Sequence, residues 1–170
     1  MKSNILLVGL DYSFIKSLAI KLADYFDMHY LDVQDLLEYS LMDRENMKLK
    51  CGEDYVEKEE QKIANSVREY ENTIINFPYS LYIKNNNHIY LNDSSITIYI
   101  KMSSNLLYNL NSKKEYSEQI LVEIITQKEL DELIEEKTNI CVDIKSIDEN
   151  ECVNRIIDKL KQNLSLMGEI

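Results

Sequence analysis

Two hydrophobic patterns alternate along this chain: short continuous runs, typical of buried strands, and repeats at three and four residues, typical of amphipathic helices. The run "ILLV" at residues 5–8 ends at Gly9, as expected of a parallel strand buried on both faces. A helix is predicted to follow and to end at Asp27. Its apolar stripe consists of Phe14, Ile15, Leu18, Ala19, Leu22, Ala23 and Phe26. This stripe leaves Lys16 and Ser17 outside the buried face.

Strands and helices are predicted to alternate over the rest of the chain. The predicted strands are 29–31, 73–77, 96–102 and 140–144, with a short strand or extended stretch at 120–125. The predicted helices are 36–41, a stretch whose buried stripe is Val56, Ile63, Ala64, Val67 and Tyr70, then 104–110, 127–137, and a last helix from Asp148 or Glu149 onward. Residues 44–52 are polar and predicted to form a loop. Residues 79–93 fit either a hairpin with an Asn turn or a short helix and loop.

This alternation predicts an α/β fold in which a three-layer arrangement places helices on both faces of a parallel sheet. With 170 residues and 45% hydrophobic content, the chain fits a single domain spanning residues 1–170. In such sheets ligands bind at the carboxyl ends of the strands. The turn after Gly9 is therefore the first place to look for a site.

Charge and cysteine content narrow the class of protein. The formal charge of −11 argues against nucleic acid or an anionic membrane surface as the main partner. The three cysteines form no CxxC pair, so we expect no metal site from them. We expect them to be reduced thiols. The apolar run near the start is too short for a signal peptide or a membrane span, and we therefore expect a cytoplasmic protein.

Several stretches, in this order and at this spacing, resemble the shikimate kinase family of small P-loop kinases. They are "NILLVGL", "HYLDVQDLLE", "CGEDYVEKEEQKI", "SSITIYIKMSSNLLYNL" and "ICVDIKSIDENECVNRIIDKL". The resemblance covers nearly the whole chain and implies a P-loop kinase-like fold. It also implies ATP and Mg²⁺ as cofactors and a small-molecule alcohol such as shikimate as substrate, wherever the family's motifs are kept.

The family's phosphate loop reads Gly-x-x-Gly-x-Gly-Lys-Ser-Thr, and here the corresponding stretch is "GLDYSFIKS". The resemblance assigns Gly9, Ser13, Lys16 and Ser17 to a vestigial phosphate loop. Tyr12 and Phe14 fall where the inner glycines would be, and Ile15 falls on the lysine position. Lys16 therefore follows one residue late, which on a helix is a rotation of about 100°. We expect a compact loop without nucleotide.

Asp11 gives a second reason to expect this. A helix N-terminus attracts phosphate through its free amides and its partial positive charge. Asp11 and Ser13 are good N-cap residues that satisfy such amides internally. Tyr12 and Tyr79 are candidates to cover the same site.

The acceptor side of the resemblance is also altered. Asp32 matches the first aspartate of the family's Asp-x-Asp motif, Gln34 replaces the second, and Asp35 is a possible substitute. The family's third-helix arginine corresponds to Glu57 or, with a shift, to Lys58. The resemblance thus gives Asp32, Gln34, Asp35 and Lys58 as candidate substrate-binding residues.

Three functions follow as hypotheses. The first is a degenerate relative that has lost catalysis, needs no cofactor and has a binding or regulatory role with, for example, a protein partner. The second is an active ATP-dependent kinase of shikimate or a related alcohol with a non-standard loop. Lys16 and Asp32 would then be catalytic, and Ser17 and Asp32 would hold Mg²⁺. The third is a chemistry outside kinases.

Overall fold

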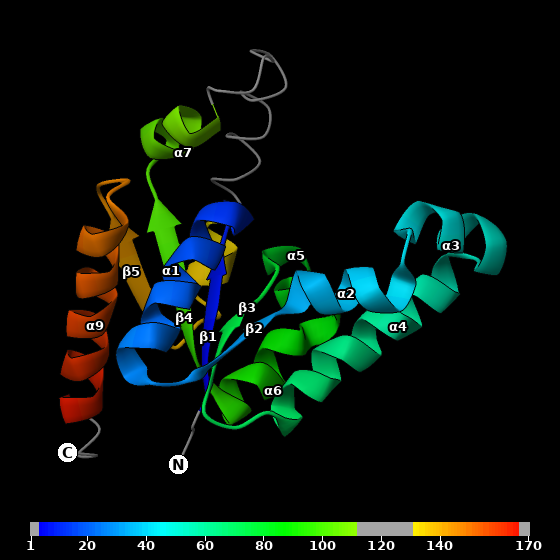
Figure 1. Ribbon diagram of the computed structural model, residues 1–170, viewed down its shortest axis with the longest axis horizontal. Helices are drawn as coiled ribbons and strands as arrows, with labels where there is room; N and C mark the ends of the chain where they lie inside the picture. Colours follow the sequence, from blue (N-terminus) through cyan, green and yellow to red (C-terminus); the bar gives the residue numbers. More distant parts are fainter. Residues whose placement is uncertain (1–3, 112–130, 167–170) are drawn as a thin grey trace.

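The computed structural model describes residues 4–111 and 131–166, and a five-stranded sheet forms their centre (Figure 1). Every strand pairs in parallel, in the order β2-β3-β1-β4-β5. The strands are β1 (Asn4–Gly9), β2 (His29–Asp32), β3 (Thr73–Asn76), β4 (Ser95–Met102) and β5 (Ile140–Ile144). The predicted parallel α/β fold is confirmed. Its carboxyl edge carries the ends of β1, β2 and β3 side by side.

Helices cover both faces of the sheet, as predicted (Figure 1). One face packs against α1 (Tyr12–Phe26) and α9 (Glu149–Leu166), where the buried stripe of α1 contacts apolar residues of β1, β4 and β5. The helices that contribute to the other core are α2 (Val33–Leu41), α4 (Glu53–Ser66), α5 (Tyr79–Ile83) and α6 (Asn87–Ser94). The remaining helices are α3 (Arg44–Cys51), α7 (Ser104–Asn111) and the short 3₁₀ turns η1 (Val67–Glu69) and η2 (Lys84–Asn86).

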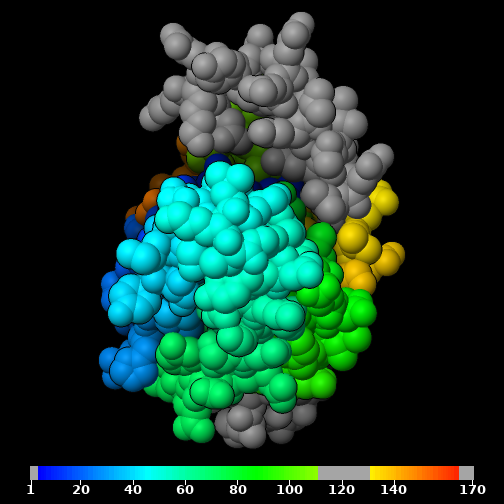
Figure 2. Space-filling model, turned by 90° about the vertical axis from the view of Figure 1, so that its right-hand side faces the viewer, coloured from blue at the N-terminus to red at the C-terminus, as the bar shows by residue number. Residues whose placement is uncertain are grey.

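The prediction of a loop at residues 44–52 is wrong, because α3 forms there. Its N-cap Asp43 accepts a hydrogen bond from the Asn46 amide at 3.1 Å, and Lys48 pairs with Glu53 of the next helix. None of its residues is buried, so no apolar stripe marks it in the sequence. Figure 2 shows α3 and α4 in the middle of the molecular face that they share with α5 and α6.

The third predicted helix ends earlier than its expected stripe. Helix α4 stops at Ser66 and a 3₁₀ turn follows to Glu69, so Tyr70 lies beyond the helix and is exposed. Val56, Ile63, Ala64 and Val67 are buried as predicted.

The ambiguous segment after β3 forms helices rather than a hairpin. Asn85 and Asn86 adopt left-handed backbone conformations, with φ of 52° and 58°, and turn the chain between α5 and α6. Asparagine tolerates this conformation better than most residues, which explains the Asn-rich turn. The predicted strand at 120–125 and the start of the helix predicted at 127–137 lie outside the described residues, whereas 131–135 are helical.

Gly9 ends β1 beneath the first turn of α1. A Cβ built there would lie 2.6 Å from Ile15 Cδ1 and 3.2 Å from the Ile100 carbonyl oxygen. The glycine is therefore required by the packing of α1 on β1 and β4, independently of any ligand.

Candidate functional site

Asp32 is the centre of a hydrogen-bonded cluster at the carboxyl edge of the sheet. Its side chain is 1% exposed. The Tyr12 hydroxyl donates to Asp32 Oδ1 and also lies 3.2 Å from the Asn76 carbonyl oxygen. The Tyr30 hydroxyl donates to Asp32 Oδ2 at 2.9 Å, and the Gln34 amide donates to Oδ1 at 2.9 Å. The carboxylate thus caps α2 and joins β2 to the first turn of α1.

Lys16 supplies the positive charge of this cluster. Its ammonium lies 2.9 Å from Asp32 Oδ2 and 3.3 Å from Asp35 Oδ1. The hydrogen bond to Asp32 raises the pKa of Lys16. Burial alone would raise the pKa of Asp32, but hydrogen bonds from Tyr12, Lys16 and Tyr30 hold it below its ordinary value. Asp32 and Lys16 therefore form an ionised pair across the loop.

The turn between β1 and α1 is closed by its own side chains. Asp11 Oδ1 accepts a hydrogen bond from the Phe14 amide at 2.9 Å and caps α1, as predicted. Ile15, to which the resemblance assigns the position of the family's lysine, is 1% exposed and packs in the core. Ser13 is exposed on the first turn. A triphosphate would meet an aspartate at the helix N-terminus and an isoleucine where it needs a cation, so these residues do not fit it.

Ser17 faces a different element from Lys16. Its hydroxyl donates to the Phe14 carbonyl at 2.8 Å, and it lowers the pKa of Glu149 on α9 by hydrogen bonding. Consecutive helix residues are about 100° apart, which separates Ser17 from the Asp32 side of α1. The structure does not bring Ser17 and Asp32 together as a pair of metal ligands.

Asn76 belongs to the same edge and was missed by the sequence reasoning. Its side chain is fully buried, and neither the side-chain nitrogen Nδ2 nor the side-chain oxygen Oδ1 has a hydrogen-bond partner among the described residues. Burial and the hydrogen bond to Asp32 raise the pKa of the neighbouring Tyr30 phenol. The sequence signal was a polar residue ending the buried run "TII".

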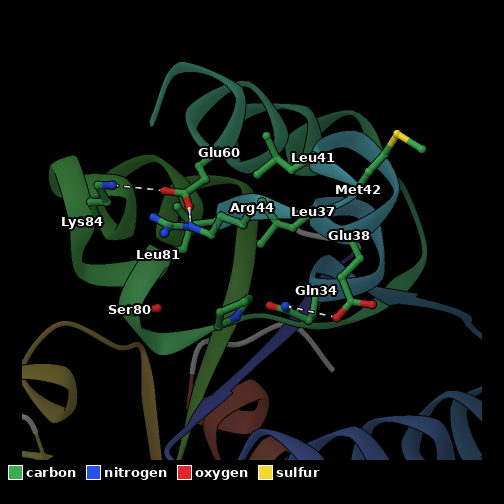
Figure 3. A pocket seen from close by; sticks show the side chains of 11 residues that line it. Gln34, Leu37, Glu38, Leu41, Met42, Arg44, Glu60, Ser80, Leu81 and Lys84 are labelled. Atoms are coloured by element: carbon green, nitrogen blue, oxygen red, sulfur yellow. Dashed lines mark hydrogen bonds and ion pairs between the residues drawn. The ribbon is translucent and has the colours of Figure 1, made fainter. Parts of the chain in front are cut away.

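A cavity of about 320 Å³ opens beside this cluster, between α2, α3, α4 and α5 (Figure 3). Its apolar wall is formed by Leu37, Leu41, Met42, Pro78 and Leu81, and its polar groups come from Gln34, Glu38, Arg44, Glu60, Ser80 and Lys84. Its volume lies at the small end of the range of ligand pockets.

Glu60 lies between the two cations of this cavity (Figure 3). Its Oε1 is 2.8 Å from Arg44 Nε, and its Oε2 is 3.1 Å from Lys84 Nζ. Burial would raise the pKa of Glu60, but the hydrogen bonds from Arg44 and Lys84 lower it. All three groups are therefore ionised and hold one another in place.

The predicted acceptor residues are divided by this geometry. Gln34 lines the cavity, and Asp32 lies at the start of the same helix. Asp35 is exposed and paired with Lys16, while Lys58 is exposed and does not line the cavity. Tyr12 covers Asp32, whereas Tyr79 packs against the core on the other face of the sheet.

The sequence prediction missed the four charged residues that line the cavity, which are Glu38, Arg44, Glu60 and Lys84. The stretch "CGEDYVEKEEQKI" resembles the family's Gly-Glu-x-x-Phe-Arg-x-x-Glu helix, and Glu60 falls on the last glutamate of that motif, so a signal for it was present. Arg44 lies in the stretch predicted as a loop, and Lys84 lies in the ambiguous segment.

Comparison with known proteins agrees with this fold. A family model described as shikimate kinase matches residues 16–161. The chain belongs to the shikimate kinase family. A shikimate kinase of Clostridium botulinum is 28% identical over 142 residues, which cover 81% of each chain.

Solved shikimate kinases share the fold. The enzyme from Bacteroides thetaiotaomicron gives a TM-score of 0.77 at 15% identity, covering 93% of this chain and 98% of that one. The enzyme from Acinetobacter baumannii, solved in complex with shikimate, gives 0.76 at 16% identity, covering 95% of this chain and 94% of the other. In the described part of this shikimate kinase relative, no helix is long and apolar enough to cross a membrane.

Proposed function

We propose that this member of the shikimate kinase family no longer transfers phosphate and acts by binding a ligand in the cavity between α2 and α5. The observation that carries the proposal is the pairing of Lys16 with Asp32 and Asp35. Lys16 lies one residue after the position that the resemblance gives to the family's phosphate-binding lysine. Its ammonium is already paired with two carboxylates of the chain itself. Releasing it would leave the buried Asp32 carboxylate without its cation, which is costly.

Two further observations support the loss of transfer. The N-terminal amides that a phosphate would use include one already bonded to Asp11. The family match begins at residue 16, after the turn that carries the phosphate loop in the family. We therefore expect no ATP or Mg²⁺ requirement, and a binding or regulatory role that includes, as one candidate, a protein partner.

Calorimetry with Mg-ATP tests this proposal. We expect no heat of binding at ATP concentrations in the millimolar range, and no turnover in a coupled assay with shikimate. Micromolar affinity that is weakened by Lys16→Ala, or any shikimate-dependent turnover abolished by that substitution, would overturn it.

The second candidate is an active kinase with a rebuilt loop, and one observation favours it. Asp32 is ionised at the carboxyl end of β2, next to the cavity, where a carboxylate is placed to accept a proton or bind a metal. In this reading Lys16 would turn from Asp32 to the phosphates, and ATP and Mg²⁺ would be required. The same calorimetry separates the two candidates.

A further inference from the structure

Both cations of the cavity are bound by one largely buried carboxylate. Glu60 is 12% exposed and uses a different oxygen for each cation, Oε1 for Arg44 and Oε2 for Lys84. A carboxylate entering from solvent would have to displace Glu60 to obtain a full ion pair. Leaving Glu60 buried and unpaired carries a large desolvation cost.

More carboxylates surround the same pair. Glu57 lies 3.0 Å from Lys84, and Glu53 lies 3.5 Å from a terminal nitrogen of Arg44. Glu45 lies 3.6 Å from Arg44 and Lys48 pairs with Glu53, so three cations and four carboxylates leave the cluster with one negative charge. The local field therefore opposes an anionic ligand.

The other end of the cavity is anionic too. Glu38 receives a hydrogen bond from the Gln34 side chain at 3.3 Å, and no ion pair to Glu38 is found in residues 4–111 or 131–166 (Figure 3). An acid lying along the cavity would meet this carboxylate after failing to displace Glu60.

Hydrogen-bonding capacity nevertheless remains on these walls. Lys84 carries three N–H donors and contacts two carboxylates, and the terminal nitrogens of Arg44 have only long contacts with Glu45 and Glu53. Glu38 and Ser80 add acceptors, and the leucines of the wall suit the carbon face of a small molecule. Such groups bind hydroxyls without requiring a charge on the ligand.

We propose that the cavity selects an uncharged, polyhydroxylated small molecule over the corresponding carboxylic acid. The proposal extends the binding role suggested above and names its ligand class. Glu60 is the residue that sets the preference, because it is the largely buried carboxylate that already pairs with both cations of the cavity.

The test compares glucitol with gluconate, which share a carbon skeleton and differ in one terminal group. Binding to the full chain is measured by NMR titration or calorimetry without nucleotide. We expect glucitol to bind at least about tenfold more tightly than gluconate. Equal affinities, tighter gluconate binding, or no binding of either probe would overturn the proposal.

Glu60→Gln supplies the second measurement, since it removes the carboxylate charge that Arg44 and Lys84 share while preserving side-chain size. We expect gluconate affinity to rise about tenfold, so that the preference for glucitol shrinks by the same factor. Glu59→Gln is the matched control, because Glu59 pairs with Lys62 away from the cavity, and it should leave the ratio unchanged. An unchanged ratio in a folded Glu60→Gln protein contradicts the role of Glu60. If that variant does not fold, the ratio in the unmodified chain decides.

These outcomes are independent of phosphoryl transfer. The binding measurements contain no nucleotide. A preference for gluconate would therefore reject the proposed ligand class without bearing on the proposed loss of catalysis. Conversely, Mg-ATP binding would reject the loss of catalysis without changing the order of the two probes.

Discussion

The partly exposed Lys16 ammonium forms an ion pair with the buried carboxylate of Asp32. It lies 2.9 Å from Asp32 Oδ2, with the lysine side chain 39% exposed and the aspartate 1% exposed. Such a pair differs from a surface salt bridge, because one partner has already lost its hydration. Its two ends lie on α1 and at the start of α2, so it ties the closed loop to the helix that lines the cavity.

Removing the cation should therefore destabilise the fold. We expect Lys16→Met to lower the free energy of unfolding by about 1–3 kcal/mol, measured by urea denaturation at neutral pH. Lys21→Met is the matched control on the same helix, since Lys21 pairs with Glu149 in an exposed contact and should cost no more than about 0.5 kcal/mol. Equal losses in the two variants would show that the Asp32 contact carries no special weight.

The same pair predicts a pH dependence. The pKa of Asp32 is lower in the folded chain than in the unfolded one, so the unfolded state binds more protons in acid. Its contribution to stability is complete above the unfolded pKa of about 4 and is lost as pH falls through the folded value. The stability difference between the unmodified chain and Lys16→Met should consequently be constant above about pH 5 and shrink as the pH falls below about 4. A difference that stays constant into this acid range would contradict the assignment.

Tyr12 should contribute through its hydroxyl alone. Tyr12→Phe keeps the ring and removes the hydrogen bonds to Asp32 and Asn76, and we expect a loss of about 1–2 kcal/mol in unfolding free energy. Tyr25 is an exposed tyrosine of the same helix, so Tyr25→Phe should change stability by less than about 0.5 kcal/mol. A neutral Tyr12→Phe variant would mean that water replaces the hydroxyl without cost.

Gly9 offers a test of why the first glycine of the loop is retained. We expect Gly9→Ala to cost about 1–3 kcal/mol, because its Cβ would meet Ile15 Cδ1 at 2.6 Å in a packed core. Ile15→Val removes that carbon, so the double variant should be more stable than the sum of the two single losses predicts. Strict additivity in denaturation experiments would place the strain elsewhere, for example against the Ile100 carbonyl.

The sheet and its first helix could be predicted from the sequence because their information is local. Continuous apolar runs indicated β1 and β4, and the stripe through Ile15 and Leu18 fixed the buried face of α1. The N-cap role of Asp11 followed from short-range capping chemistry, and the end of the helix at Asp27 was also predicted. These features depend on neighbouring residues.

Two kinds of feature could not be predicted from the sequence: a helix without a buried face, and side-chain clusters that join distant residues. Helix α3 buries none of its side chains, so its hydrophobic pattern carried no signal. Arg44, Glu60 and Lys84 come from three helical segments separated by 16 and 24 residues, and only the fold brings them together. The same holds for Tyr12 and Asp32, which are 20 residues apart. Side-chain clusters of this kind require the packed structure to be seen.

The burial of Ile15 fixes the closed turn between β1 and α1 to the hydrophobic core. Its side chain fills the space between Gly9 and the strands beneath α1. The sequence resemblance assigns this position to the family's lysine. Restoring that lysine would place an ammonium in an apolar core and empty a packed site at the same time. If phosphate transfer has been lost as proposed, an Ile15→Lys exchange alone would therefore destabilise the chain before it restored a phosphate loop.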